Sequence, residues 1–404
     1  MALLPVGLVL ACGVEMLPPE EELLVVTPCE MGKADIYPCE GLDLVARVEL
    51  RDSGVVNDIW GWTDPITGVE WVLAGHSDGT FFISLEDPDD PLLLGFLRRT
   101  ADTRSTIWRD IKVYRDHAYI VSDLAGEHGI QVFDLRLLRG MTAYRNLSPT
   151  YTYDEVHSAH NIAINEETGF AFATGMSSGG TTCGSGLHMV DLSSPADPEF
   201  AGCFSYTGGR SYTHDAQCVV YRGPDAAYRG AEICLGANEV LLSIADVTDK
   251  ESPVAIGSGS YPDVGYLHQG WLDAGHVYFY TNDELDEFRG GRTRTLIWDV
   301  RDLNDPFVVA EHVHETGASD HNLYVVGDRM YQSNYGAGLR VFDISDREAP
   351  VEIAFFDTDP GIDEEVPGLN GSWSNYPFFA SGIIAVTSMD GGVFLLLPSE
   401  LRPE

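Results

Sequence analysis

Short apolar runs, each opened by two polar residues, recur along most of this chain at nearly constant spacing. Asp110 is followed by Ile111-Lys112-Val113, and Asn322 by Leu323-Tyr324-Val325-Val326. A period of about fifty residues made of short strands is typical of a β-propeller, in which each repeat forms one blade of four antiparallel strands. The pattern therefore predicts an all-β, seven-bladed β-propeller. The seven polar pairs are Asn57-Asp58, Arg109-Asp110, His160-Asn161, His214-Asp215, His268-Gln269, His321-Asn322 and Ser374-Asn375.

A second repeated run fixes the register of the blades. Gly129-Ile130-Gln131-Val132-Phe133-Asp134 and Gly338-Leu339-Arg340-Val341-Phe342-Asp343 are two versions of one strand. Most copies are followed by a turn rich in Asp and Pro and then by another apolar strand, as at Asp197-Pro198. Proline presets φ and aspartate caps backbone donors, so both suit such a turn. Each repeat thus reads as four short strands with no helical period between them.

The seventh repeat ends too early to supply an outer strand. The run 392–398 is followed by only six residues, whereas residues 42–50 resemble an outer strand and precede the first polar pair. We therefore expect the N-terminal strand to complete the last blade, which leaves no open sheet edge. The predicted organisation is a signal-like segment (1–12), a tether (13–28), a cysteine-closed loop (29–41), the propeller (42–398) and a tail (399–404).

The innermost strand of every blade lines a common axis, so the polar pairs predict a ring of polar groups around one mouth of the channel. Adjacent residues on a strand point to opposite faces, so only one member of each pair is expected to face the channel. If the second members face it, the ring is Asp58, Asp110, Asn161, Asp215, Gln269, Asn322 and Asn375, and oxygen ligands suit calcium or a polar ligand. If the first members face it, the ring holds Asn57, Arg109, His160, His214, His268 and His321, which suits a softer metal or an anionic ligand.

Three uses of this ring remain open. The polar groups could cap backbone groups and hold ordered water, bind a divalent metal (calcium or a transition metal), or bind an organic ligand. Tryptophans near the pairs, such as Trp60 and Trp271, either form an aromatic mouth for carbohydrate or peptide or pack between blades. The acidic loop with Asp283, Glu284, Asp286 and Glu287 could hold calcium, although it lacks the spacing of an EF-hand. No Gly-x-Ser-x-Gly or His-Glu-x-x-His motif occurs in the sequence, so serine hydrolase and zincin chemistry have no support.

The composition of the chain limits the classes of partner that it is expected to bind. The formal net charge is −39, from 63 acidic and 24 basic residues, which argues against binding nucleic acid and against electrostatic adsorption to anionic lipid. It favours a soluble surface or the attraction of divalent cations. No apolar run is long enough to span a bilayer. Any membrane association is therefore expected to come from a lipid anchor. The protein is expected to be monomeric.

The cysteines point to an oxidising compartment. The apolar start of the chain is followed directly by Cys12, as in a bacterial lipoprotein signal. Cys12 is therefore a candidate for lipidation, and the protein is expected to be exported to the cell envelope. The remaining six cysteines form an even set suited to disulfides, whose connectivity the sequence leaves open. We favour Cys29–Cys39 and Cys218–Cys234, each of which closes a short loop, and Cys183 and Cys203 are the remaining candidates.

Taken together, the polar motifs resemble those of the choice-of-anchor B family, whose blades carry LVIVD-type repeats. The likeness rests on segments such as Asn57-Asp58-Ile59-Trp60-Gly61-Trp62, Tyr212-Thr213-His214-Asp215 and Asp320-His321-Asn322, and it spans roughly residues 29 to 398. The resemblance implies a propeller fixed to the cell surface, here through Cys12, and no established reaction. The leading hypothesis is a non-enzymatic binding module for a protein, peptide or glycan ligand. The alternative is a metal-dependent enzyme, an oxidoreductase or a hydrolase, that uses the axial histidines.

Overall fold

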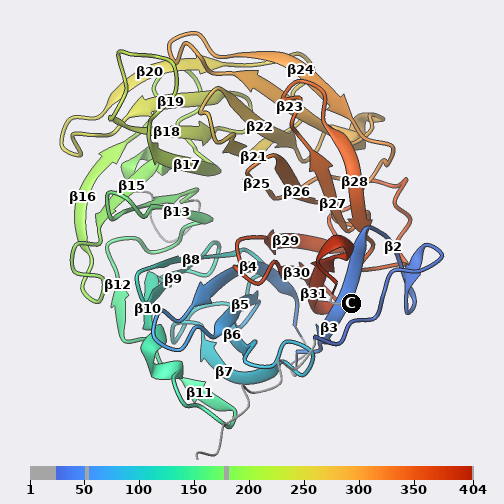
Figure 1. Ribbon diagram of the computed structural model, residues 1–404. Coiled ribbons are helices and arrows are strands. Elements are labelled where there is room, and N and C mark those ends of the chain that lie inside the picture. The colour runs from blue at the N-terminus through green and yellow to red at the C-terminus, as the bar shows by residue number, and fades with distance from the viewer. Residues whose placement is uncertain (1–23, 51–53, 177–181, 403–404) are drawn as a thin grey trace, which may run out of the picture.

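Seven antiparallel sheets stand around a central axis, as the sequence period predicts (Figure 1). The computed structural model describes residues 24–50, 54–176 and 182–402. Within these ranges the helical elements are four short 3-10 turns: η1 (Leu135–Leu138), η2 (Cys183–Ser185), η3 (Glu287–Arg289) and η4 (Ser399–Leu401). None of the helices in these ranges is long and apolar enough to cross a membrane.

The first three blades follow the chain outward from the axis. Blade 1 contains β4 (Val56–Thr63), β5 (Glu70–His76), β6 (Gly79–Ser84) and β7 (Leu92–Arg98). Blade 2 contains β8 (Arg109–Tyr114), β9 (His117–Ser122), β10 (Ile130–Asp134) and β12 (Tyr151–Tyr153). Blade 3 contains β13 (Asn161–Asn165), β14 (Phe170–Thr174), β15 (Leu187–Asp191) and β16 (Glu199–Phe204).

The next three blades repeat this order. Blade 4 contains β17 (Asp215–Val220), β18 (Glu232–Ala237), β19 (Leu242–Asp246) and β20 (Val254–Gly259). Blade 5 contains β21 (Leu267–Leu272), β22 (Tyr278–Asp283), β23 (Arg294–Asp299) and β24 (Phe307–Val313). Blade 6 contains β25 (Leu323–Val326), β26 (Arg329–Ser333), β27 (Leu339–Asp343) and β28 (Val351–Phe356).

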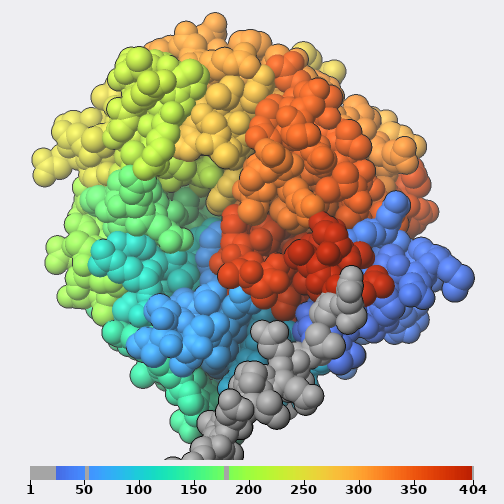
Figure 2. All heavy atoms as spheres, viewed as in Figure 1, coloured from blue at the N-terminus to red at the C-terminus, as the bar shows by residue number. Residues whose placement is uncertain are grey.

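The N-terminal strand closes the ring, as predicted. Blade 7 combines β29 (Ser372–Tyr376), β30 (Ile384–Ser388) and β31 (Gly392–Pro398) with β3 (Leu42–Val48) as its outer strand. Figures 1 and 2 show the blue N-terminal segment packed against the red C-terminal one. Asp43 of β3 is fully buried and accepts hydrogen bonds from Ser399 and Arg402, which ties the two ends of the propeller together.

Two small additions to the sheets were not predicted. The segment between β10 and β12 crosses to blade 1, where β11 (Arg145–Leu147) pairs parallel with β7. The cysteine-closed loop forms a hairpin of β1 (Lys33–Ala34) and β2 (Tyr37–Glu40), which extends blade 6 beyond β28. Both additions cover a sheet edge that would otherwise be exposed.

The glycine that opens the third strand in five of the seven blades is explained by the closeness of the outer strand. Gly338 and Gly392 both have positive φ, at +71° and +92°. A Cβ atom on Gly338 would lie 2.2 Å from the Phe356 carbonyl oxygen, and one on Gly392 would lie 2.4 Å from that of Val48. Only glycine tolerates both the backbone conformation and this contact. The N-terminal strand therefore makes the same close approach in blade 7 that β28 makes in blade 6.

The core lies between blades. Trp62 and Phe82 of blade 1, for example, are buried in one cluster with Ile111 and Phe133 of blade 2. Such clusters leave the inner ends of the strands free to carry polar groups along the axis.

Candidate metal centre

The polar pairs lie where the inner strands begin, and in blades 3 and 6 both members reach the axis. His160 and His214 come directly before β13 and β17, and His321 and Asn322 precede β25. In blades 1 and 5 a β-bulge spans the pair. Strand alternation does not apply at these positions. The expectation that only one member of each pair faces the channel is therefore wrong in blades 3 and 6, where both members border one small axial cavity. Its lining residues are Asp58, Arg109, His160, Asn161, His214, His268, His321, Asn322 and Trp373.

Four histidines form an arc around the axis. The ring centroids of His160 and His214 lie 4.4 Å apart, those of His214 and His268 4.2 Å, and those of His268 and His321 4.3 Å. Trp373 packs edge-on against His321 at 4.7 Å and ends the arc. Repeat symmetry thus brings into contact side chains that are about fifty residues apart in sequence.

Backbone contacts fix the tautomer of two of these histidines. The Nδ1 atom of His214 lies 2.8 Å from the His268 carbonyl oxygen, and that of His321 lies 2.5 Å from the Trp373 carbonyl oxygen. A carbonyl oxygen can only accept, so Nδ1 carries the proton in both rings. The Nε2 atoms of His214 and His321 are then left with a lone pair.

Glu284 meets two of the histidines at the axis. It follows β22, and its carboxylate accepts a hydrogen bond from the Tyr335 hydroxyl at 2.8 Å. Its Oε2 atom lies 3.9 Å from His268 Nε2, and its Oε1 atom lies 3.8 Å from His321 Nε2. We call His268, Glu284 and His321 the axial triad.

Burial sets the charges of the axial triad. It raises the pKa of Glu284 to about 7. It lowers the pKa of His321 to about 3, and it lowers the pKa of His268 well below the ordinary value, with the neighbouring His214 adding to the effect. Both imidazoles are therefore neutral at physiological pH, which is the form that binds metal ions.

The geometry of the axial triad fits a metal ion. One ligand atom from each of the three residues lies within 4.8 Å of the others. Two ligand atoms bound about 2 Å from one ion lie roughly 3 to 4 Å apart, as the nitrogen–oxygen separations here do. Those separations are too long for hydrogen bonds, so the three groups converge without bonding to one another.

A cavity of about 300 Å³ lies over the axial triad, and we call it the triad cavity. Aromatic side chains form much of its wall, and the exposed Leu124 and Leu369 also border it. A ligand bound to an ion at the triad could therefore extend toward solvent. The aromatic lining residues are Trp108, Tyr212, Tyr266, Tyr335 and Trp373.

The second members of the pairs connect neighbouring blades. Asp58 accepts a hydrogen bond from the Ile111 amide at 2.9 Å, and Asp110 accepts one from the Ile162 amide at 2.7 Å. Gln269 binds both the amide and the carbonyl of Leu323, each at 3.0 Å. Similar contacts join Asn161 to the His214 carbonyl and Asn375 to the Ser333 hydroxyl. Apart from Asn375, these side chains satisfy backbone groups at the inner strands, which is the capping role considered from the sequence.

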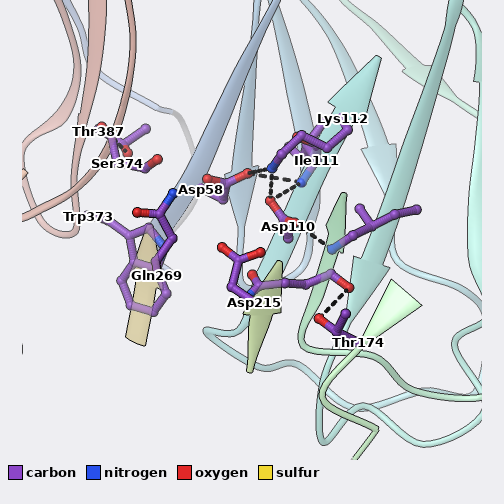
Figure 3. A network of polar contacts seen from close by, with 12 residues as sticks. Asp58, Asp110, Ile111, Lys112, Thr174, Asp215, Gln269, Trp373, Ser374 and Thr387 are labelled. Atoms are coloured by element: carbon purple, nitrogen blue, oxygen red, sulfur yellow. Dashed lines mark hydrogen bonds and ion pairs between the residues drawn. The ribbon is translucent and has the colours of Figure 1, made fainter. Parts of the chain in front are cut away.

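Lys112 neutralises part of the negative charge of the aspartates among these second members. Its ammonium group lies 2.5 Å from Asp110 and 4.0 Å from Asp58, and Asp215 lies nearby (Figure 3). Burial alone would raise the pKa of Asp110, but the charge of Lys112 and several hydrogen bonds lower it. Burial and the charge of Asp110 raise the pKa of Asp58 well above its usual range and that of Asp215 to about 7. Asp110 is therefore the carboxylate that stays ionised beside Lys112.

Arg109 borders the small axial cavity, but its guanidinium group has only donors and cannot serve as a metal ligand there. It is buried, and its Nη1 atom lies 3.2 Å from His128 Nε2. Burial lowers its pKa to about 9. Asn57 is also fully buried within blade 1. These two first members do not extend the histidine arc.

A second cavity, of about 380 Å³, lies at the opposite end of the axis. Residues that follow the polar pairs along the inner strands line it, whereas residues that precede the pairs line the triad cavity. We call it the lysine cavity because Lys112 lies at its wall, 4.5 Å from the centre of the Trp60 ring. Asp215 and Gln269 from the polar pairs border it as well. Its aromatic lining residues are Trp60, Trp271, Tyr324, Tyr376 and Phe378.

The other predicted residues divide into separate groups. The acidic loop does not act as one unit, because Glu284 faces the axis whereas Asp283, Asp286 and Glu287 are buried in a neighbouring cluster with Asp320. Six cysteines form the disulfides Cys29–Cys39, Cys183–Cys203 and Cys218–Cys234, with Cα atoms 6.0, 5.0 and 4.1 Å apart. Cys12 lies outside the described residues.

Sequence reasoning missed Tyr335 and the pairing of Glu284 with the histidines. Tyr335 lies in a loop after β26 and belongs to none of the repeated motifs. Glu284 stood among other acidic residues, so its direction could not be read from the sequence. A sequence period reveals only residues that recur from blade to blade, whereas Tyr335 and Glu284 each occur in a single blade.

Comparisons with known proteins support the fold alone. No protein-family model and no curated protein sequence matches the chain. Among solved structures, a protein from Lactobacillus plantarum is 12% identical, with a TM-score of 0.51 over 83% of this chain and 89% of that one. A functionally unknown protein from Desulfotomaculum acetoxidans is 11% identical, with a TM-score of 0.55 over 87% and 99%. The outer coat vertex of COPII on membranes is 11% identical, with a TM-score of 0.56 over 85% and 83%. Membership of the choice-of-anchor B family therefore stays a proposal.

Proposed function

We propose that this protein is an exported binding propeller that holds a divalent transition-metal ion at the axial triad. The observation that carries the proposal is the convergence of His268, Glu284 and His321 from three different segments. Their nitrogen and oxygen atoms lie 3.8 and 3.9 Å apart and have no hydrogen bond between them. Neutral imidazole and carboxylate form a ligand set that suits zinc, copper or iron better than calcium.

The tautomer of His321 supports this assignment. Metal-binding histidines commonly donate their other ring N–H to a carbonyl or carboxylate, which orients the ring. His321 donates its Nδ1–H to the Trp373 carbonyl. Glu284 in turn accepts a hydrogen bond from the Tyr335 hydroxyl, which orients its carboxylate. The surroundings of the triad thus aim the free atoms at one point.

Metal analysis of the purified protein tests the proposal. The wild type is expected to bind about one equivalent of zinc or cobalt, and His268→Ala and His321→Ala should each lower the affinity by about tenfold or more. His312→Ala is the matched control, because His312 lies on the outer strand β24. Absence of stoichiometric binding in the wild type, or unchanged binding in both axial variants, would overturn the proposal.

Metal-dependent catalysis is the second candidate function. It is favoured by the triad cavity, because catalytic zinc sites commonly have three protein ligands and an open position for water or substrate. The test is a screen of the metal-loaded protein for ester and phosphoester hydrolysis and for oxidation. Turnover that disappears in His268→Ala would support an enzyme. A metal-loaded protein without turnover in this screen would favour the binding function.

We further propose that the lysine cavity binds a glycan of the cell surface. Aromatic rings on one side offer flat surfaces for the apolar faces of sugars, and Lys112, Asp215 and Gln269 offer donors and acceptors for hydroxyl groups. A glycan array with wild-type protein and Trp271→Ala tests this, with Trp373→Ala in the triad cavity as the control. Binding that survives Trp271→Ala, or no binding at all, would contradict it.

The location of the protein completes the proposal. Three disulfides indicate an oxidising, exported environment. We propose that Cys12 is lipidated and fixes a monomeric propeller to a bacterial cell envelope, as the resemblance to the choice-of-anchor B family implies. Labelling of the full chain with a fatty acid in a bacterial host, lost in Cys12→Ser, is the expected result. Equal labelling of both proteins would contradict this anchor.

A further inference from the structure

Arg109 is a buried cation whose charge is not balanced by the side chains that it contacts. It opens β8, and its exposed fraction is 2%. Burial lowers its pKa to about 9, so the guanidinium group is still charged at neutral pH. An isolated charge in a protein interior is strongly unfavourable and is normally paired or bound to an ion of opposite sign. Arg109 therefore needs a negative partner.

The hydrogen bond of Arg109 to His128 supplies no negative charge. The Nη1 atom of Arg109 lies 3.2 Å from His128 Nε2, and His128 Nδ1 lies 2.9 Å from the Gly129 carbonyl oxygen. A carbonyl oxygen can only accept, so Nδ1 carries the proton and Nε2 accepts from Arg109. Burial and the charge of Arg109 lower the pKa of His128 to about 3, so this ring is neutral. The contact positions the guanidinium group without balancing it.

One edge of the Arg109 guanidinium group has no partner. Its Nε and Nη2 atoms make no hydrogen bond to any of the described residues. These two N–H groups point the same way and can donate together to one anion. Three other arginines of this chain use the same edge to bind a carboxylate, in the pairs Arg136–Asp134, Arg139–Asp64 and Arg402–Asp43. In Arg109 the edge that binds an anion in those three pairs meets no carboxylate of the described chain.

The carboxyl groups around Arg109 are engaged with other partners. Asp58 borders the same small axial cavity, but it accepts from the Ile111 amide at 2.9 Å and lies 4.0 Å from Lys112. Asp78 acts on Arg109 only through its electric field and pairs with Arg99 at 3.0 Å. Neither carboxyl group forms an ion pair with Arg109.

Thr80 offers a further donor in the same interface between blades 1 and 2. Arg109 and Ile111 lie two residues apart on β8, and Thr80 and Phe82 lie two residues apart on β6, so each pair shares one face of its strand. Ile111 and Phe82 are packed in the cluster between the two blades. Thr80 is fully buried, and its hydroxyl has no partner among the described residues.

The side-chain amide of Asn57 lies on the same face of blade 1. Gly75 is paired with Thr80, and a Cβ atom on Gly75 would lie 2.1 Å from the Oδ1 atom of Asn57. Asn57 is fully buried, and its Nδ2 atom also has no partner in the described ranges. The interface between the first two blades therefore holds unpaired donors from three residues.

We propose that the Nε and Nη2 edge of Arg109 binds a chloride ion between blades 1 and 2. Thr80 and Asn57 are the further candidate donors to it. The small axial cavity that Arg109 borders has a volume of about 10 Å³, which is room for one water-sized particle and not for a phosphate or an organic acid. A monatomic anion balances the buried charge within this space. The inference goes beyond the proposed function and does not depend on metal binding at the axial triad.

Thermal unfolding of the full chain in chloride and in gluconate tests the inference. Both sodium salts are compared at equal ionic strength and with a chelator present, so that screening and metal binding are held constant. Above the dissociation constant, each tenfold rise in chloride should raise the melting temperature by about 1–2 °C, whereas gluconate is too large to bind. The net charge of −39 opposes non-specific uptake of anions, so a chloride-specific rise reports a defined site.

Arg109→Met removes the charge, keeps a side chain of similar length and should abolish the chloride-specific rise. Arg136→Met is the matched control, because Arg136 uses the same edge to bind Asp134 at the surface. His268→Ala should respond to chloride as the wild type does. A response that is lost in His268→Ala and kept in Arg109→Met would place the chloride on a metal ion at the axial triad and overturn the inference.

Bromide diffraction of wild-type crystals gives a second readout that does not depend on the folding of a variant. An anomalous peak is expected within hydrogen-bonding distance of Nε and Nη2 of Arg109. An ordered water at this edge without a halide peak would overturn the inference, as would equal melting temperatures in chloride and gluconate. Loss of zinc binding in His268→Ala with the halide peak retained is expected if both sites exist. A halide peak in a protein that takes up no zinc would overturn the axial metal site alone.

Discussion

Burial decides which protons compete with a metal ion at the axial triad. His321 and His268 are neutral because burial lowers the pKa of each, to about 3 in His321. Glu284, whose pKa burial raises to about 7, is the member that still takes up a proton near neutral pH. The carboxylic acid must lose that proton before it can bind a metal ion.

The zinc affinity should therefore fall as the pH drops through about 7, by up to about tenfold per pH unit. Glu284→Gln removes the titrating group, so its weaker zinc affinity should be nearly constant between about pH 5.5 and 8. Calorimetric titrations at several pH values measure both. A pH dependence that persists in Glu284→Gln would assign the competing proton to a histidine.

Asp110 connects two inner strands, β8 and β13, through one carboxylate. It accepts from the Ile162 amide at 2.7 Å and from the Ile111 amide at 2.9 Å, and it pairs with the buried Lys112. Asp110→Ala leaves these donors buried without their partner, so we expect the free energy of unfolding to fall by about 3 kcal/mol. Urea unfolding measures the change, with the exposed Asp302→Ala as control. A loss below about 1 kcal/mol would mean that Asp58 replaces Asp110 as the partner of Lys112.

Among the elements, β3 has the clearest prediction. It is the outer strand of blade 7, with Val48 paired to Val393 and Leu42 to Pro398. Deletion of residues 1–50 should abolish cooperative thermal unfolding, because it removes this strand and exposes the edge of β31. Deletion of residues 1–23 leaves every described strand in place and should have little effect. Similar melting curves for the two deletions would contradict the closure.

The disulfides give a second prediction at this scale. Cys218 and Cys234 lie opposite each other on β17 and β18, and the Cys29–Cys39 bond closes the loop that carries β1 and β2. Peptide mapping without reduction should recover all three pairs in exported protein. Each bond is expected to add about 2–4 kcal/mol to stability by restricting the unfolded chain. Free thiols at these positions would contradict both the pairing and the oxidising compartment.

The sequence was most informative about repeated elements. The spacing of Asp58, Asp110 and the later polar residues predicted seven blades, and the short final repeat predicted the closing role of residues 42–50. It did not predict β11, because whether a three-residue strand joins blade 1 or stays in the linker depends on packing across blades rather than on local pattern. For the same reason the hairpin of β1 and β2 was read only as a cysteine-closed loop.

For the candidate site too, the sequence predicted the repeated residues and not those that occur once. The period placed His160, His214, His268 and His321 around one axis, because identical blades repeat identical positions. Strand alternation failed to say which pair member faces the channel, since the pairs lie before the strands or at bulges. Glu284 could not be assigned, because its direction depends on a loop that occurs once.

At the scale of the whole molecule, buried carboxyl groups make stability depend on pH. Burial raises the pKa of Asp215 and of Glu284 to about 7 and that of Glu287 to about 9. In the unfolded chain the same groups titrate near about 4. The folded carboxyl groups therefore keep protons that the unfolded chain has lost, so their contribution to stability falls as the pH rises through about 7 to 9. The buried histidines, whose pKa values are lowered, act in the opposite direction only below about pH 6.5.

The metal-free protein should accordingly melt at a higher temperature at about pH 7 than at about pH 9, a range in which the histidines are neutral in both states. Self-repulsion of the net charge of −39 acts in the same direction. Thermal unfolding in the presence of a chelator measures the difference. Equal melting temperatures at the two pH values would contradict the raised pKa values.

The closure of blade 7 also has a consequence for biosynthesis. The ribosome delivers β3 early and β31 among the last residues, yet each needs the other as its neighbour in the sheet. At 5–20 residues per second the nascent chain spends on the order of half a minute with β3 waiting for its partner. Throughout that interval an apolar strand has an unpaired edge, which invites pairing with other chains. A holding chaperone that binds extended apolar segments would thus be needed most by the first strand of the propeller to be made.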